Sequence, residues 1–385
     1  MLKKIKKILC ILGMVIAVAT VSVFTWWWFL DGGEGYYRYT FHKNHEPFTF
    51  RDTTNTDPIY SDEKFYKTLQ NQLHLDDSTM QTICDNSYVI PGLKATRTIT
   101  DNSAHTMDIC TSMTPQGITF ANDYVLISAY CCTKQHNSVI YVLDKDTHDF
   151  LKEIVLPDKS HVGSIAFDNI HNNVWVCCYN DSSKTAFVCA FSLEEMEKYQ
   201  FDISFSPIRY SLQYPIDTQK RTSFMNYYDN ALYVGYFETN IKAESTVQEF
   251  ELNDDGGLKT TPNLMNEIYE DEPDEYALPS SVFYISGNAQ GMALNSTFVA
   301  ITQSHGSDNT SRLRTFSNLK NSDGNVDARD FNFLNAIDLP VMAEDCYMDA
   351  HGNLYVCFES AAYAYRARKC DHVDRIVYLP AKVYS

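Results

Sequence analysis

A strand-turn-strand phrase recurs five times between residues 116 and 359, and this repeat constrains the fold more than any other feature of the chain. Each unit is a short strand, then an Asn, Asp or Gly turn, then a strand in which an aromatic or aliphatic residue, Val or a close relative, and a small residue follow one another. The five units read QGITFANDYVLISAY, GSIAFDNIHNNVWVCCY, SFMNYYDNALYVGYF, QGMALNSTFVAITQS and EDCYMDAHGNLYVCFE. A unit that recurs in this way is the sequence signature of a repeat architecture.

Further apolar runs follow most of the units. They include SVIYVLDK and FLKEIVLP after the first unit, SRLRTFSN and FLNAIDLP after the fourth, and AAYAYRA and RIVYLP after the fifth. Two inner and two outer strands make the four-stranded blade of a β-propeller, and units that begin about 47 to 66 residues apart match known blade lengths. The sequence therefore predicts an all-β fold, a single propeller of five four-stranded blades.

Residues 87–99 leave the blade number open, because they could form an outer strand or the remnant of a sixth blade. Closing a propeller normally brings a strand from one end of the chain into the terminal blade at the other end. We therefore expect residues 87–112 to pair with the C-terminal blade. The predicted propeller spans 87–385, and residues 31–86, with one short helix near 61–75, form a stalk or packed extension.

The first thirty residues differ from the rest. Four lysines precede an uncharged run from Ile8 to Leu30, which is long enough to cross a bilayer as a helix. We predict a single-pass anchor in the cell membrane, with the lysines cytoplasmic and the propeller extracytoplasmic. The alternative is a signal peptide cleaved near Ala19 and a secreted protein, although the run continues past Ala19 into Trp26, Trp27 and Trp28, which suit a membrane interface.

The acidic charge limits the partners. The formal net charge is −18, and removing the four lysines leaves −22 on the predicted exported part. Such a surface does not bind nucleic acid through bulk charge, whereas cationic ligands, divalent ions or basic proteins suit its field. The eleven cysteines include no CxxC pair, so no zinc motif and no disulfide pairing is predicted.

The phrases PQGITF, SHVGSIAFD, NVWV, AQGMAL and GNLYV resemble the inner-strand repeats of bacterial propellers of the NHL, streptogramin-lyase and gluconolactonase-like kind. The resemblance covers about residues 113–385 and implies a propeller fold. Proteins of this kind include lactonases, lyases and binding proteins, so the resemblance does not choose among these functions. The Glu, Asn and Asp metal set of the gluconolactonase-like proteins cannot be traced here.

Propeller geometry places two sets of residues at one rim of the central channel, because the first strand of a blade begins where the antiparallel second strand ends. We expect the rim to bind ligand through amides, imidazoles, carboxylates and aromatic rings. The predicted ligand-binding residues are Gln116, Tyr130, His161, Tyr179, Gln290, His305, Glu344 and Glu359, and Ser223 and Phe237 occupy the equivalent positions in the third unit. The glycines that follow Gln116 and Gln290 are expected where the backbones crowd together.

Candidate catalytic residues are His161, His305 and Glu344, which could act as acids or bases or hold a divalent ion. No GxSxG, HExxH, P-loop or EF-hand pattern is present, so enzyme activity stays uncertain. No cofactor and no metal site are predicted, although a divalent cation such as calcium could bind at the rim or at the acidic run 266–275. We expect an extracytoplasmic propeller that binds a small polar ligand, a glycan or a protein; the alternatives are a lactonase-like hydrolase or lyase and an architectural scaffold.

Overall fold

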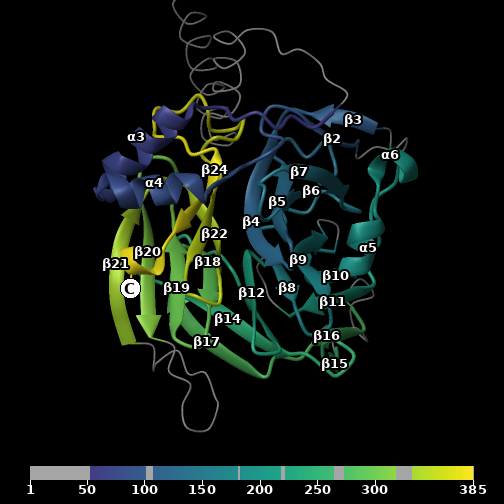
Figure 1. Ribbon diagram of the computed structural model, residues 1–385. Coiled ribbons are helices and arrows are strands. Elements are labelled where there is room, and N and C mark those ends of the chain that lie inside the picture. The colour runs from purple at the N-terminus through teal and green to yellow at the C-terminus, as the bar shows by residue number, and fades with distance from the viewer. Residues whose placement is uncertain are drawn as a thin grey trace, which may run out of the picture.

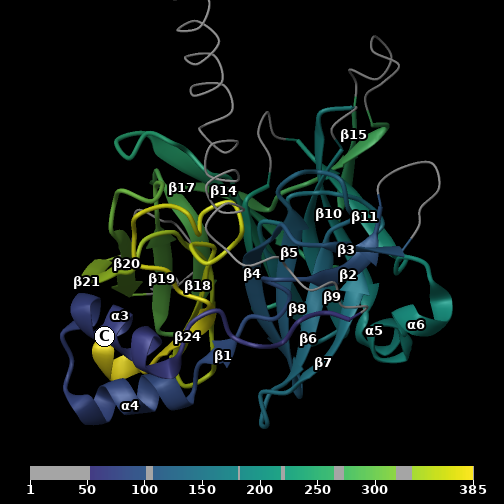
Figure 2. The same ribbon diagram turned by 90° about the horizontal axis from the view of Figure 1, so that it is seen from above.

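The computed structural model describes residues 53–100, 107–180, 183–217, 222–263, 273–317 and 332–384. Within them five sheets, antiparallel apart from one added strand in the second, stand around a common axis (Figures 1 and 2). The innermost strands of consecutive sheets contact each other in chain order, and the innermost strand of the last sheet contacts that of the first. The fold is a closed propeller of five blades, as the repeat predicts, and the alternative of six blades is wrong.

The first three blades follow the order of the chain. Blade one contains β4 (Met113–Ala121), β5 (Tyr124–Cys131), β6 (Val139–Asp144) and β7 (Phe150–Val155). Blade two contains β8 (Ile165–Asp168), β9 (Asn173–Asn180), β10 (Thr185–Ser192) and β11 (Leu212–Ile216), and it is extended by β16 (Glu275–Ala277) and β15 (Thr260–Pro262). Blade three contains β12 (Phe224–Tyr228), β13 (Ala231–Gly235), β14 (Glu244–Glu251) and β17 (Ser281–Ser286).

The last two blades bring the ends of the propeller together. Blade four contains β18 (Ala289–Leu294), β19 (Phe298–Gln303), β20 (Ser311–Ser317) and β21 (Asn332–Leu339). Blade five contains β22 (Ala343–Met348), β23 (Leu354–Phe358), β24 (Arg375–Leu379) and, as its outermost strand, β1 (Tyr88–Val89). Tyr88 lies opposite Ile376, so the expectation that residues 87–112 reach the C-terminal blade is confirmed for β1.

Two helices cover the outer side of blades four and five. They are α3 (Asp62–Leu73) and α4 (Asp77–Asp85), which contact β21 and β24 respectively. Ser61 and Asp76 cap their N-termini by accepting bonds from the backbone N–H three residues on. The buried faces of the two helices join the core of blades four and five, so this part of the extension packs onto the propeller.

A small hairpin lies beside blade one. It consists of β2 (Thr96–Ile99) and β3 (Met107–Cys110), and β2 contacts β7. The helices α5 (Leu193–Lys198) and α6 (Phe201–Ser204) connect β10 to β11, and the 3-10 turn η2 (Ala381–Val383) follows β24. In Figure 1 the hairpin lies above blade one, at the same end of the molecule as α3.

The proposed membrane segment, Ile8 to Leu30, lies outside the described residues, as does the rest of the chain before residue 53. In the part of the chain that is described, no helix combines the length and apolar character needed to cross a membrane. The anchor therefore stays a prediction.

Candidate functional site

The innermost strands of blades one, four and five each contain a β-bulge at the same place. The pairing of inner and second strand shifts between Pro115 and Ile118, between Ala289 and Gly291, and between Ala343 and Cys346. A bulge adds a residue to one strand and redirects a side chain. The residues inside these bulges include Gln116, Gln290 and Glu344, three of the predicted rim residues.

The glycine that follows each glutamine lies against the backbone of the next blade. A Cβ on Gly117 would lie 2.7 Å from the Cα of Ser164, and a Cβ on Gly291 would lie 2.6 Å from the Cα of Asp345. Real Cβ atoms do not approach a backbone so closely, so only glycine fits at these two positions. The crowding expected from the repeated Gln-Gly pair is confirmed.

A hydroxyl group on the second strand links neighbouring blades beside each of these glycines. Ser128 Oγ donates to the carbonyl of Val162 at 2.8 Å, and Thr302 Oγ1 donates to the carbonyl of Glu344 at 2.6 Å. Cys177 and Cys357 occupy the same position in other blades and are buried free thiols. The sequence position common to these residues is therefore a packing position between blades.

Six of the eight predicted rim residues line one cavity of about 230 Å³. These are Gln116, Tyr130, His161, Gln290, Glu344 and Glu359, and the lining is completed by Thr222, Ser223, Phe237 and Tyr365. All five blades contribute to it, through their strands or through the loops that lead into and out of those strands. The structure thus brings residues more than 240 positions apart in the sequence to one site.

A chain of hydrogen bonds orders the polar side chains of this cavity. His161 Nε2 lies 2.6 Å from Gln116 Oε1, and Gln116 Nε2 donates to Glu359 Oε2 at 3.2 Å. The ring of Tyr130 stacks on that of His161, with centroids 4.0 Å apart. On the opposite side, Gln290 Nε2 donates to Glu344 Oε1 at 3.2 Å.

The two carboxyl groups are strongly perturbed. Burial, and then the neighbouring Glu359, raises the pKa of Glu344 well above its usual value. Burial also raises the pKa of Glu359, to about 7, although hydrogen bonds from Glu344, Gln116 and Tyr365 oppose the shift. Two carboxyl groups in contact do not readily ionise together, so near neutral pH the pair holds a proton in common.

Two of the predicted rim residues lie elsewhere. Tyr179 lines a larger hollow of about 810 Å³ in blade two, together with Asp158, Arg209 and Tyr210. His305 lines a separate hollow of about 480 Å³. The candidate acid-base residues His161 and His305 therefore do not face the same cavity.

His305 nevertheless lies beside a residue of the rim cavity. Its ring meets the Phe237 ring edge-on, with centroids 6.3 Å apart. Phe237 lines the cavity that contains Glu344, but it does not line the hollow of His305.

Sequence reasoning missed Thr222 and Tyr365 as lining residues. Thr222 is one residue before the predicted rim position Ser223, so the repeat could have suggested it. Tyr365 lies in the segment AAYAYRA, which the sequence predicted as an outer strand but which forms turns between β23 and β24. Contact with Glu359 and burial raise the pKa of Tyr365 well above its usual value, which keeps its hydroxyl protonated and able to donate.

The other cation candidate, the acidic run 266–275, falls mostly on residues 264–272, which lie outside the described residues. The possibility of calcium at the rim or in this run stays a prediction.

Comparisons with known proteins support no closer assignment. No family model and no curated protein matches the chain. Among solved structures, a protein of unknown function from Bacteroides caccae is 12% identical with a TM-score of 0.31, over 58% of this chain and 61% of that one. The RRP9 WD40 repeats are 9% identical with a TM-score of 0.37, over 76% of this chain and 99% of that one. A chain of the mitotic checkpoint complex is 7% identical with a TM-score of 0.38, over 74% and 86%.

The class of this protein follows from its strand pairing. Five closed antiparallel blades define a β-propeller, which is the coarse part of the resemblance described above. The finer assignment to propellers of the NHL, streptogramin-lyase or gluconolactonase-like kind stays a prediction.

Proposed function

We propose that this protein is a binding propeller that recognises a small polar ligand, with a cationic group of that ligand facing Glu344 and Glu359. The observation that carries the proposal is the convergence of these carboxyl groups with two amides, an imidazole and aromatic rings in one cavity. Apolar and aromatic walls with a few oriented polar groups are typical of a ligand site. The ligand could equally be part of a protein, such as a single side chain.

The size of the cavity limits what can enter. A volume of about 230 Å³ is below the ~300 to 1,000 Å³ of ordinary small-molecule sites, so the cavity holds a small molecule or one group of a larger one. An extended glycan would place a single unit in it.

The charges of the lining favour a cation. No Lys or Arg is among the lining residues, whereas two buried carboxyl groups are, and their pKa values are raised even though the charge of Arg368 acts on Glu359 from outside the lining. A bound cation would stabilise both carboxylates and expel their shared proton. An aromatic ring such as that of Phe237 also attracts ammonium groups through its face.

Binding of ammonium probes is expected to become tighter as the pH rises from 5 to 8, because the carboxyl pair must lose its proton. Choline and ethanolamine are suitable probes, glucose and galactose are neutral ones, and calorimetry gives the affinity. The double variant Glu344→Gln, Glu359→Gln should bind the ammonium probes at least about tenfold more weakly, a loss of 1.4 kcal/mol. Asp338→Asn, in the separate hollow that His305 lines, is a charge-matched control that should leave binding unchanged.

Other results of this experiment point to the alternatives. Binding of the neutral sugars without pH dependence would favour a glycan site and contradict a cationic ligand. Turnover of a lactone or sugar acid added to the same panel would favour the enzyme. Equal affinity in the double variant and the wild type would exclude the rim cavity as the binding site.

We also propose that the N-terminal segment anchors the propeller outside the cytoplasm. The support is the uncharged run from Ile8 to Leu30 behind four lysines. After expression of the full chain, the protein should stay in the membrane during alkaline extraction, and protease added outside should digest the propeller. Deletion of residues 2–30 is the control and should release a soluble protein. A soluble product that begins after Ala19 would instead show a cleaved signal peptide.

A further inference from the structure

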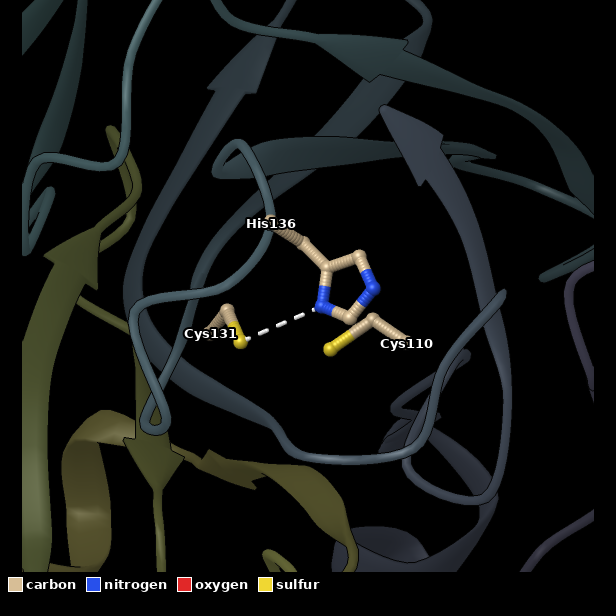
Figure 3. Close-up of side chains that lie close together, drawn as sticks. All are labelled: Cys110, Cys131 and His136. Carbon is tan, nitrogen blue, oxygen red and sulfur yellow. Dashed lines mark hydrogen bonds between the residues drawn. The ribbon is translucent and has the colours of Figure 1, made fainter. Parts of the chain in front are cut away.

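Three potential metal ligands meet beside blade one, away from the rim cavity. Cys110 ends β3, Cys131 ends β5, and His136 lies in the loop between β5 and β6. Their ligand atoms all lie within 4.8 Å of one another, and in Figure 3 the two sulfur atoms and the imidazole face a common point. His136 Nδ1 is 3.5 Å from Cys131 Sγ.

The imidazole is oriented from its other side by a carboxylate. His136 Nε2 lies 3.3 Å from Asp108 Oδ2, so a proton on Nε2 leaves the lone pair of Nδ1 directed at the two sulfur atoms. Metal-binding histidines commonly have this carboxylate partner, which fixes the tautomer and the ring orientation. This contact is independent of the clustering of the three ligands.

Hydroxyl groups surround the sulfur atoms. Ser112 Oγ is 3.4 Å from both Cys110 Sγ and Cys131 Sγ, and Thr133 Oγ1 is 3.0 Å from Cys131 Sγ. Cys110 and Cys131 are 0% and 1% exposed, and His136 is 8% exposed. The cluster is therefore almost closed to solvent, with polar groups placed to hydrogen-bond to sulfur.

Two cysteines beside an imidazole form a soft donor set of the kind that zinc prefers.

We propose that Cys110, Cys131 and His136 bind a zinc ion. Two sulfur ligands and one imidazole nitrogen supply three corners of a tetrahedron, and water or the Ser112 hydroxyl supplies the fourth. The site ties the β2–β3 hairpin to the second strand of blade one. Cys131 directly follows Tyr130, so the metal also fixes the strand end that presents Tyr130 to the rim cavity.

The spacing of the ligands explains why no sequence motif marks them. Cys110 belongs to the hairpin, whereas Cys131 and His136 belong to blade one, and no CxxC pair is involved. A disulfide between Cys110 and Cys131 is the rival use of the two thiols. The oriented imidazole favours the metal, because a disulfide leaves the His136–Asp108 contact without a role.

The full chain, purified without chelators from cells grown with zinc, is expected to contain about one zinc per molecule by elemental mass spectrometry. Cys110→Ser, Cys131→Ser and His136→Ala should each lose most of that zinc. Asp108→Asn should keep the ligands but bind zinc about 10- to 100-fold more weakly in a competition with a chromogenic chelator.

A second buried cysteine pair provides the matched control. Cys178 and Cys189 lie on the adjacent strands β9 and β10 and interact through their thiols, but they belong to no metal-ligand cluster among the described residues. Cys178→Ser and Cys189→Ser should retain full zinc. Cobalt loaded in place of zinc should give a thiolate-to-metal charge-transfer band that only the three ligand variants abolish.

Two outcomes would overturn the proposal. In the first, the wild-type protein contains no zinc, and the mass of a peptide that holds both Cys110 and Cys131 shows a disulfide between them, with two hydrogen atoms lost. The other is equal zinc content in the ligand variants and in the Cys178 and Cys189 controls. Circular dichroism of each variant shows whether it folds. If a ligand variant does not fold, the zinc affinity of Asp108→Asn still tests the proposal.

Discussion

Gly117→Ala and Gly291→Ala are each expected to destabilise the propeller by about 3 kcal/mol, the upper end of the usual cost of overpacking. The added Cβ would lie 2.7 Å from Ser164 Cα in one case and 2.6 Å from Asp345 Cα in the other. Backbone atoms cannot move aside as a flexible side chain can, so two blades must separate. Urea denaturation followed by circular dichroism measures the loss.

Gly306→Ala is a control that distinguishes the effect of steric contact on stability from the effect of backbone conformation. No atom lies within 4 Å of a Cβ at Gly306, but its φ is +69°. Alanine there should cost only the strain of the left-handed conformation, about 1 to 2 kcal/mol. If all three variants lost the same stability, the close approach of blades at Gly117 and Gly291 would not be what requires glycine.

The second large effect expected is a loss of stability as the pH rises, caused by Glu344 and Glu359. Their pKa values are raised in the folded protein, so the folded state holds protons that the unfolded state releases above about pH 4.5. Their contribution to stability is therefore fully present below that pH and is lost as the pH rises through about 7, the pKa of Glu359. The rise of the Glu359 pKa from 4.5 to about 7 corresponds to a contribution to stability on the order of 3 kcal/mol.

Urea denaturation at pH 5 and pH 8 tests this effect. Glu359→Gln should lose less stability than the wild type between the two pH values, because the contribution of the buried Glu359 is removed. Some pH dependence should stay, since burial also raises the pKa of Glu344 and of Asp345. An unchanged pH dependence in Glu359→Gln would show that Glu359 contributes nothing to it.

The propeller could be predicted because its signal is repeated. Each inner pair of strands carries the same pattern, so five weak indications support one another, and the pairing of β1 with β24 followed from the need to close the ring. The segment AAYAYRA, expected as an outer strand, forms turns instead. Arg366 in that segment donates to the carbonyls of Ala361 and Leu93, tertiary contacts that local alternation does not reveal.

The rim residues could be predicted from strand geometry wherever the pairing of a blade's first and second strands extends as far as the rim. Tyr130 lies opposite Thr114 in such a pair. In blade two, however, β8 begins at Ile165, which pairs with Val176, so Tyr179 lies beyond the paired inner strand and turns to another hollow. His305 similarly follows the end of β19, and its position depends on a loop that no repeat constrains.

Strand β1 is synthesised long before the strand with which it pairs. Its partner in blade five is almost 290 residues further along the chain, because Tyr88 lies opposite Ile376. At a synthesis rate of about 5 to 20 residues per second, the β1 segment waits about 15 to 60 s for its partner to be made. Until then blade five is incomplete, and the strands at both ends of the ring have unpaired edges. Such edges can pair with other chains. The nascent chain is therefore vulnerable to aggregation until β24 has been synthesised.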